Sequence, residues 1–178
     1  MTTYVALLRG VNVSGHKLIK MVDLRRHFAS CGAANVRTYI QSGNVVFEHR
    51  ATAVALGKRL EQHLAAQLGY TVPILIKTAR ELAAITLANP YDTSLPEFGK
   101  KMYVCFFKNP PAAAAVKGIQ SLICDGEQLI VNGAAAYAYY AQGLGRAKLS
   151  SGVIERKLGA ATLRNWNTVT ALLEMAKS

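Results

Sequence analysis

The hydrophobic pattern of the first 76 residues predicts strands and helices in the order of a split βαβ fold. Residues 4–8 are apolar on both alternating faces, as is typical of a central strand covered on two sides. A leucine recurs at every fourth residue from Leu56 to Leu68, which predicts an amphipathic helix ending at Gly69. The elements expected here are residues 4–8, 21–31, 36–41, 44–48, 56–68 and 72–76. This β-α-β-β-α-β order is that of ferredoxin-like folds.

A hairpin is expected between residues 36–41 and 44–48. Its two-residue turn is Ser42-Gly43, because glycine accepts a positive φ. In that register Ile40 lies opposite Val45, and Thr38 lies opposite Phe47. The side chains expected on the core face are Val36, Thr38, Ile40, Val45 and Phe47.

The domain organisation follows from Pro and Gly positions. Residues 1–88 form the first half, which ends in a short helix that starts with the capping-box pattern Thr78 to Glu81. Residues 89–100 form a connector, and residues 101–178 form a second α+β half. The elements expected in that half are strands at 102–107, 122–124, 128–131 and 135–140, a helix after Pro110-Pro111, and helices at 151–158 and from Thr162 onward. We therefore expect an α+β protein, with a ferredoxin-like half packed on a second half that has a mainly antiparallel sheet and two C-terminal helices.

Composition and charge narrow the classes of partner. The chain has 178 residues, of which 51% are hydrophobic and 17% charged, which is typical of a globular protein. It carries 21 Lys and Arg against 10 Asp and Glu, a formal net charge of +11. This basic balance favours an anionic partner such as nucleic acid, a phosphorylated metabolite or an acidic protein. A basic charge that serves only solubility is the alternative.

Location follows from cysteine usage and from the absence of an apolar leader. The three cysteines form no CxxC pair, which favours a reducing compartment. No signal peptide and no membrane-length apolar run is visible, so we expect a cytoplasmic protein without a membrane partner.

Two glycine-containing motifs are expected to meet at one sheet edge. The segment Arg9–Asn12 follows the first strand, and Gln41–Asn44 follows the second, which runs parallel to the first in a split βαβ unit. The first helix begins at the same edge, and exposed N–H groups at a helix start favour an anion. The residues predicted to bind a ligand here are Arg9, Gly10, Asn12, Lys17, Gln41, Ser42 and Asn44. Glycine and asparagine are also common turn residues, and Arg9 could simply bridge strand ends.

A second polar constellation lies near the C-terminus. Residues 146–168 contain five basic residues and a single acid, Glu155. Trp166 lies on the apolar stripe of the expected last helix, so we expect it in the core, with Thr162 or Asn165 as the cap. The residues predicted to contact a ligand here are Lys148, Arg156, Arg164 and Asn167.

Several kinds of chemistry lack support. The segment Gly10–Lys17 departs from a P-loop, because His16 precedes the lysine and Leu18 stands where a Mg²⁺-binding Ser or Thr is needed. The four histidines show no ligand spacing, so no metal and no cofactor is expected. The cysteines sit in apolar segments typical of inert core thiols. Open-sheet RNA binding is disfavoured because both faces of the first strand are apolar. Whether the protein is an enzyme stays open.

Three ordered segments resemble the domain of unknown function 1697 family. They are Ala6–Val13, Arg37–Phe47 and Lys148–Val169. The family often has Gly-Gly-Lys-Asn where this chain has Ser14-Gly15-His16-Lys17. Lys17 therefore lies next to the position of the family lysine rather than at it. The resemblance implies a bacterial-type cytosolic α+β protein of two linked halves, and it implies no activity or catalytic residue.

These observations lead to three hypotheses. The first is a binding protein for an anionic ligand, with nucleic acid or a nucleotide foremost, at a basic, glycine-containing sheet edge. The second is an enzyme acting on a small phosphorylated or carboxylated substrate in a cleft between the halves, with His16 or Asp92 as acid or base. The third is a protein-binding adaptor, which would show an exposed apolar patch. No oligomeric state is predicted.

Overall fold

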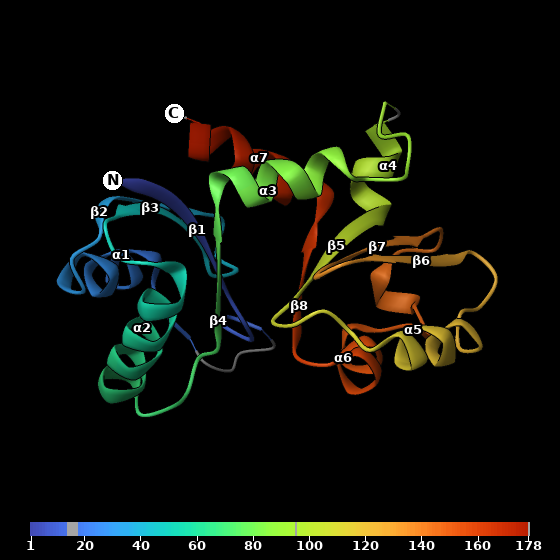
Figure 1. The fold of residues 1–178 in the computed structure, drawn as a ribbon, viewed down its shortest axis with the longest axis horizontal. Coiled ribbons are helices and arrows are strands. Elements are labelled where there is room, and N and C mark those ends of the chain that lie inside the picture. The colour runs from blue at the N-terminus through green and yellow to red at the C-terminus, as the bar shows by residue number, and fades with distance from the viewer. Residues whose placement is uncertain (14–17, 95, 178) are drawn as a thin grey trace. The chain divides into compact units, whose positions relative to one another are not determined.

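The structure is a computed structural model that describes residues 1–13, 18–94 and 96–177. Contacts between Cα atoms divide the chain into two compact units (Figure 1). Unit 1 comprises residues 1–84 and 171–178, and unit 2 comprises residues 85–170. No helix in the described part of the chain is long and apolar enough to cross a membrane.

Unit 1 has the ferredoxin-like topology that the sequence predicts. Its elements are β1 (Thr2–Leu8), α1 (Met21–Ser30), β2 (Ala34–Tyr39), β3 (Asn44–His49), α2 (Ala53–Leu68), β4 (Ile74–Thr78) and the start of α3 (Ala79–Leu87). The sheet order is β2-β3-β1-β4, and all neighbouring strands are antiparallel. The split βαβ prediction is confirmed.

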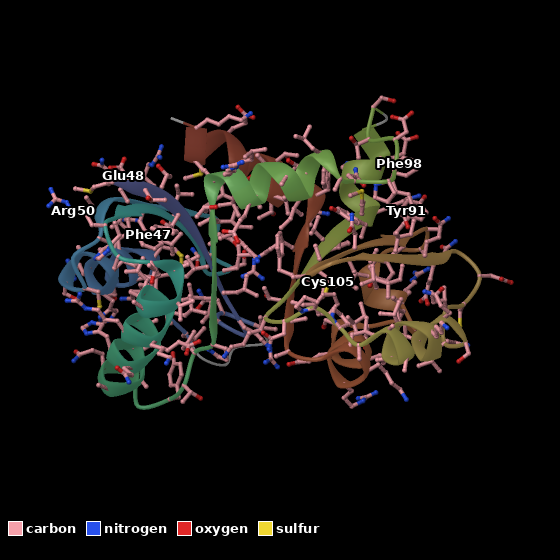
Figure 2. The ribbon with its side chains drawn as sticks, viewed as in Figure 1. Phe47, Glu48, Arg50, Tyr91, Phe98 and Cys105 are labelled. Carbon is pink, nitrogen blue, oxygen red and sulfur yellow. The ribbon has the colours of Figure 1, made fainter. Side chains whose placement is uncertain are left out.

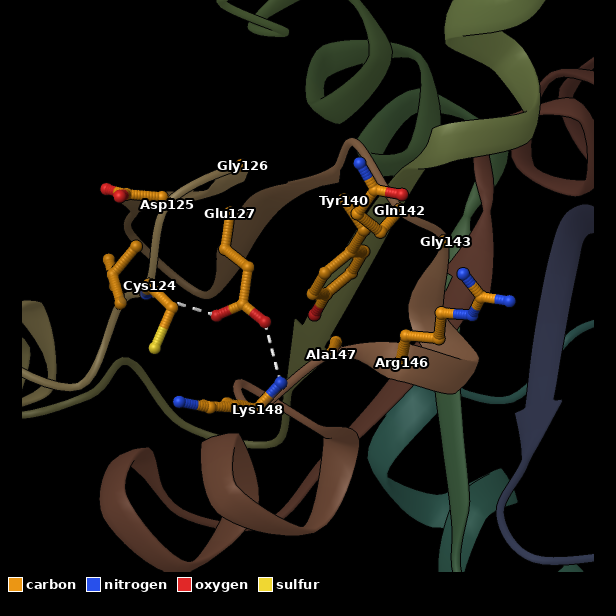
Figure 3. A pocket seen from close by; sticks show the side chains of 11 residues that line it. Cys124, Asp125, Gly126, Glu127, Tyr140, Gln142, Gly143, Arg146, Ala147 and Lys148 are labelled. Atoms are coloured by element: carbon orange, nitrogen blue, oxygen red, sulfur yellow. Dashed lines mark hydrogen bonds between the residues drawn. The ribbon is translucent and has the colours of Figure 1, made fainter.

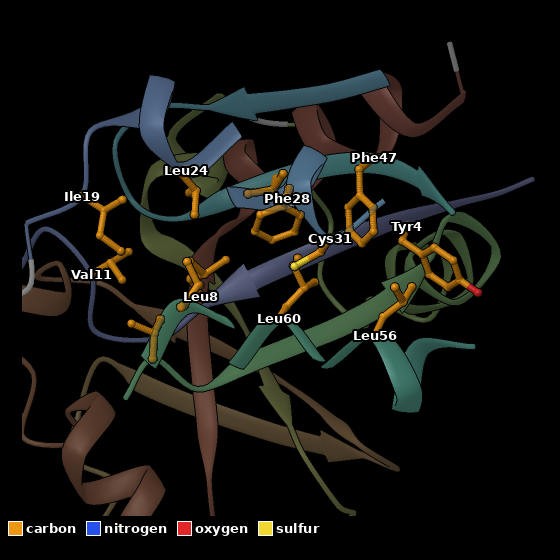
Figure 4. Packing of buried hydrophobic residues seen from close by; sticks show 14 residues of the cluster. Tyr4, Leu8, Val11, Ile19, Leu24, Phe28, Cys31, Phe47, Leu56 and Leu60 are labelled. Carbon is orange, nitrogen blue, oxygen red and sulfur yellow. The ribbon is translucent and has the colours of Figure 1, made fainter. Parts of the chain in front are cut away.

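The core of unit 1 forms where α1 and α2 cover one face of the sheet (Figure 4). The rings of Phe28 on α1 and Phe47 on β3 meet edge to face, with centroids 5.1 Å apart. Leu60 on α2 belongs to the same buried hydrophobic cluster as these two rings. Burying each such side chain contributes about 1.5–3 kcal/mol. The opposite face of β1 is also buried at Val5 and Leu7, as the apolar pattern predicts.

The β2–β3 hairpin differs from the predicted register. Thr38 pairs with Val45 and Tyr39 pairs with Asn44, so the turn comprises residues 40–43 rather than two residues. The reason is the side chain of Asn44, whose Nδ2 donates to Tyr39 O at 3.2 Å and to Ser42 Oγ at 2.8 Å. These bonds close a wider turn.

The prediction that Ile40 lies in the core is wrong. Ile40 falls inside this wider turn, with φ +47° and 53% of its surface exposed. A left-handed conformation costs an L-residue about 1–2 kcal/mol, and a β-branched side chain is especially unsuited to it.

The capping box at the start of α3 is confirmed. The backbone N–H of Glu81 donates to Thr78 Oγ1 at 3.1 Å, and the backbone N–H of Thr78 donates to Glu81 Oε2 at 2.7 Å. Two N–H groups that the helix leaves unpaired are thereby satisfied.

Unit 2 repeats the same topology with different residues. Its elements are α4 (Pro96–Lys101), β5 (Met102–Phe107), α5 (Ala113–Gln120), β6 (Glu127–Asn132), β7 (Ala135–Tyr140), a 3₁₀ turn (Leu144–Arg146), α6 (Ser151–Leu158), β8 (Ala161–Asn165) and the start of α7 (Trp166–Lys177). The antiparallel sheet order is β6-β7-β5-β8, which matches that of unit 1 position by position. The second half is therefore also a βαββαβ unit.

Two predictions for the second half are wrong. Residues 122–124 form a turn rather than a strand. The last helix starts at Trp166 rather than Thr162, because residues 161–165 form β8 and pair with β5. Asn165 then caps α7, with its Oδ1 accepting from the backbone N–H of Asn167 at 3.0 Å. Trp166 is buried as predicted.

Candidate functional site

The end of β1, the β2–β3 turn and the start of α1 meet at one edge of unit 1. We call it the loop edge, and Asn12 holds it together. Asn12 Nδ2 donates to Gln41 O at 2.8 Å and to Ile19 O at 3.0 Å, while Asn12 Oδ1 accepts from the backbone N–H of Ile19 at 2.8 Å. The structure therefore brings the two predicted motifs together.

The amides at the loop edge serve the fold. The three hydrogen bonds of the Asn12 side chain all go to backbone groups. Asn44 is fully buried and bonds to Tyr39 and Ser42. Ligand contacts by Asn12, Ser42 and Asn44 stay predictions. Of the other predicted residues, Arg9 and Gly10 follow β1 at this edge and Gln41 is exposed. Lys17 and His16 lie outside the described residues.

A groove of about 480 Å³ opens at the loop edge. Its lining residues are Asn12, Leu18, Ile19, Lys20, Asp23, His27, Gln41 and Leu68. Lys20 is exposed at the start of α1, and Asp23 pairs with Arg26 at 3.0 Å. The groove thus combines apolar side chains with one exposed cation, Lys20. The acid nearest to Lys20 in the sequence, Asp23, is already paired with Arg26.

In unit 2, Glu127 on β6 fastens the loop that precedes α6 (Figure 3). Its carboxylate accepts from the backbone N–H of Lys148 at 2.6 Å, of Leu149 at 3.3 Å and of Cys124 at 3.3 Å. Tyr140 adds a bond from its hydroxyl to Leu149 O at 3.0 Å, and burial raises the pKa of Tyr140. This loop is therefore tied to the sheet at several atoms.

A pocket of about 530 Å³ lies beside Glu127. Arg146 and Lys148 both line it, but Figure 3 shows their charged ends pointing in opposite directions. The two cations therefore do not converge on one small ligand inside the pocket.

Six exposed cations of unit 2 lie on or next to α5 and α6, which pack side by side on one face of the sheet (Figure 1). We call this set the α5–α6 basic face, and it comprises Lys108, Lys117, Arg146, Lys148, Arg156 and Lys157. The backbone N–H of Lys108 donates to Ala160 O at 3.0 Å, which places Lys108 beside the end of α6. None of the six forms an ion pair within the described part of the chain. Residues 108–157 contain three acids, and Glu127 is committed to backbone N–H groups.

Arg164, which the sequence predicts to contact a ligand, is buried rather than at the surface. Arg164 lies on β8 with 9% of its surface exposed, and its guanidinium donates to Thr162 Oγ1 at 2.7 Å and to Leu163 O at 2.9 Å. Burial lowers the pKa of Arg164 to about 10. Asn167, by contrast, is exposed in the first turn of α7.

The central strands of both sheets are buried on the face that a base would need. Val5 and Leu7 on β1 are buried on the face opposite the helices, and so are Val104 and Phe106 on β5. Recognition of RNA on an open sheet needs exposed aromatic rings at such positions. These four positions offer no exposed ring for a base, and disfavoured open-sheet RNA binding stays a prediction.

The candidate nucleophiles and acid–base groups have little support. Cys105 is buried, and burial raises the pKa of its thiol far above the usual value (Figure 2). Cys31 is likewise buried, whereas Cys124 is half-buried in a turn, so the prediction of a core thiol is wrong there. Asp92 is exposed, and hydrogen bonds with Ser94 lower its pKa, which is opposite to the shift of a general acid.

A histidine pair links α1 to α2. His27 Nδ1 lies 3.2 Å from His63 Nε2, which is also 3.2 Å from Ser30 Oγ. Within the described ranges no group of three His, Cys, Asp or Glu could hold a metal ion. The sequence gives no sign of this pair, because the two histidines are 36 residues apart and meet only through helix packing.

Acidification should weaken unit 1 through His27. Burial lowers the pKa of His27 below its ordinary 6.5, the neighbouring His63 lowers it further, and Asp23 opposes the shift. A lowered pKa means that the unfolded chain binds the proton more readily. The free energy of unfolding should therefore fall as pH drops through 6.5 toward the lowered pKa of His27. Urea unfolding across this range should show a smaller pH dependence in His27→Gln, and an identical pH dependence would contradict the assignment.

The fold places this chain among α+β proteins built from two βαββαβ units. Comparison with known proteins identifies its family. Residues 1–137 match the family model described as protein of unknown function (DUF1697), and the chain belongs to that family. A search of curated proteins gave no match.

Among solved structures, a conserved bacterial protein, SP0830 from Streptococcus pneumoniae, is similar over 100% of this chain and 99% of its own, with a TM-score of 0.79 and 21% identity. This likeness supports the fold alone. An unknown protein from Galdieria sulphuraria matches with a TM-score of 0.28 and 11% identity over 99% of this chain and 91% of its own, which carries no argument.

Proposed function

We propose that this protein binds nucleic acid through the phosphate backbone, using the α5–α6 basic face. The observation that supports this most directly is the set of six exposed cations on neighbouring elements, without ion pairs in the described part of the chain. Such cations contribute most to binding affinity when they contact phosphates, because binding then releases the counterions condensed on the nucleic acid. Lys148 and Arg156 are the predicted ligand residues that belong to this face.

The arrangement of the cations favours a polymer over a free nucleotide. A nucleotide site needs groups that converge on one phosphate cluster, whereas Arg146 and Lys148 point apart in their pocket. Cations spread over two helices and a loop instead suit a backbone with phosphates at regular intervals. We propose a cytoplasmic location for this activity, because the three cysteines are free thiols.

Removing charge from this face should weaken nucleic-acid binding. The test variant combines Lys148→Ala, Arg156→Ala and Lys157→Ala, which truncate exposed side chains and leave the helix caps intact. The dissociation constant for a labelled single-stranded oligonucleotide, measured by fluorescence anisotropy at low salt, should rise roughly tenfold or more.

The matched control removes three cations that already have partners. Arg26, Lys77 and Lys177 pair with Asp23, Glu81 and Glu174, all in unit 1. The triple alanine variant of these residues changes net charge equally and should bind almost as the wild type does. Equal losses in both variants would mean that affinity follows net charge alone, and would contradict the assigned face.

A further inference from the structure

Exposed aliphatic side chains gather at the loop edge of unit 1. Val13, Leu18 and Ile40 are 58%, 70% and 53% exposed, and we call these three the aliphatic edge. Val13 follows Asn12 in the sequence. Leu18 and Ile40 precede Ile19 and Gln41, whose carbonyl oxygens accept hydrogen bonds from Asn12. The aliphatic edge is defined by described residues alone, and residues 14–17 lie outside the described ranges.

The backbone at Ile40 shows that folding alone does not favour isoleucine there. Its φ of +47° suits glycine or asparagine, and the other left-handed positions at this edge, Gly10, Asn12 and Gly43, use those residue types. The exposed side chain also gains little from burial within the protein. A strained, exposed apolar residue at a loop tip is typical of a site that contacts another molecule.

The adjoining groove indicates the chemistry of that molecule. Leu18, Ile19 and Leu68 supply an apolar lining, and Lys20 supplies an exposed cation without an ion pair in the described residues. Asp23 also lines the groove, and its carboxylate already pairs with Arg26. The complement is a segment with apolar side chains next to a carboxylate. Exposed aliphatic groups provide no ring on which a base could stack, so the surface suits a protein better than a nucleic acid.

We propose that the loop edge of unit 1 is a docking surface for an acidic, apolar segment of a partner protein. Leu18 and Ile40 contact its apolar side chains, and Lys20 pairs with its carboxylate. This inference is independent of nucleic-acid binding, because it rests on different residues in the other unit.

The proposal is tested by selecting peptides from a random library on the whole wild-type protein. Peptides that also bind the Ile40→Asp variant are removed. Enriched peptides should combine apolar residues with Asp or Glu. Their dissociation constants, measured by calorimetry, should rise at least tenfold in Ile40→Asn and in Lys20→Glu. The control Val54→Asn replaces another exposed aliphatic residue of unit 1, 73% exposed on α2, and should bind the peptides as the wild type does.

Ile40→Asn also separates lost docking from lost folding. Asparagine tolerates the left-handed conformation, so the midpoint of thermal unfolding should rise by a few degrees while peptide binding falls. The proposal is overturned by a selection without enrichment, by enriched peptides that are basic, or by peptides that bind Ile40→Asn unchanged. Self-association of the wild type in sedimentation runs, abolished by Ile40→Asp, would assign the surface to a second copy and overturn it equally.

Discussion

Replacing Gly43 with alanine is expected to lower the free energy of unfolding by about 2–4 kcal/mol. Gly43 has φ +72°, and an added Cβ would lie 2.5 Å from Val11 Cγ2 and 2.8 Å from Leu8 Cβ. Those neighbours are buried and cannot move aside cheaply, since the backbone N–H of Leu8 also donates to Gly43 O at 2.8 Å. Left-handed strain and overpacking therefore add. Urea unfolding measures the change.

Gly57 provides the matched control. It lies inside α2, where an added Cβ meets nothing within 4 Å. Gly57→Ala should stabilise the protein by about 0.5–1 kcal/mol, because alanine is the better helix former. If Gly43→Ala unfolds at the wild-type urea concentration, the close packing of the β2–β3 turn on Val11 and Leu8 is wrong.

Replacing Glu127 with alanine should cost about 2–4 kcal/mol of unfolding free energy. Its carboxylate accepts from the backbone N–H groups of Cys124, Lys148 and Leu149, and bonds to a charged acceptor are worth more than neutral ones. Without it, these donors lose their shared partner at a half-buried position.

Glu127→Gln separates charge from shape. Glutamine keeps one carbonyl oxygen in nearly the same place, so its loss of stability should lie between those of the wild type and Glu127→Ala. Calorimetric unfolding of the three proteins tests this order. Equal stability of wild type and Glu127→Ala would show that the carboxylate does not fasten the loop before α6.

Local signals in the sequence predicted most of unit 1 correctly. The leucine spacing of α2 and the Thr78–Glu81 capping box act within one or two helical turns, so the sequence reveals them directly. The β8 strand was missed because its partner, β5, lies about sixty residues earlier in the chain and no local pattern shows that pairing. The turn length at Ile40 was missed because side-chain bonds of Asn44 decide it. The common topology of the two units was invisible because no residue-level repeat accompanies it.

The candidate site was predictable in part. Lys148 and Arg156 were found because basic residues crowd the sequence around α6. The exposed cations Lys117 and Lys157 could have been found from the polar faces of their helices. Lys108 gives no such signal, since its place beside α6 depends on a bond to Ala160. Sequence alone also cannot distinguish an asparagine that bonds the backbone, such as Asn12, from one that bonds a ligand.

The salt dependence of oligonucleotide binding tests the central claim most directly. For wild type, the logarithm of the association constant should fall linearly with the logarithm of salt concentration, by about 0.7 per single-strand phosphate contacted. The Lys148, Arg156 and Lys157 triple alanine variant should reduce that slope by about two, because three phosphate contacts are lost. The Arg26, Lys77 and Lys177 control should keep the wild-type slope. Equal slopes in all three proteins, or no binding by wild type at low salt, would contradict nucleic-acid binding through the α5–α6 basic face.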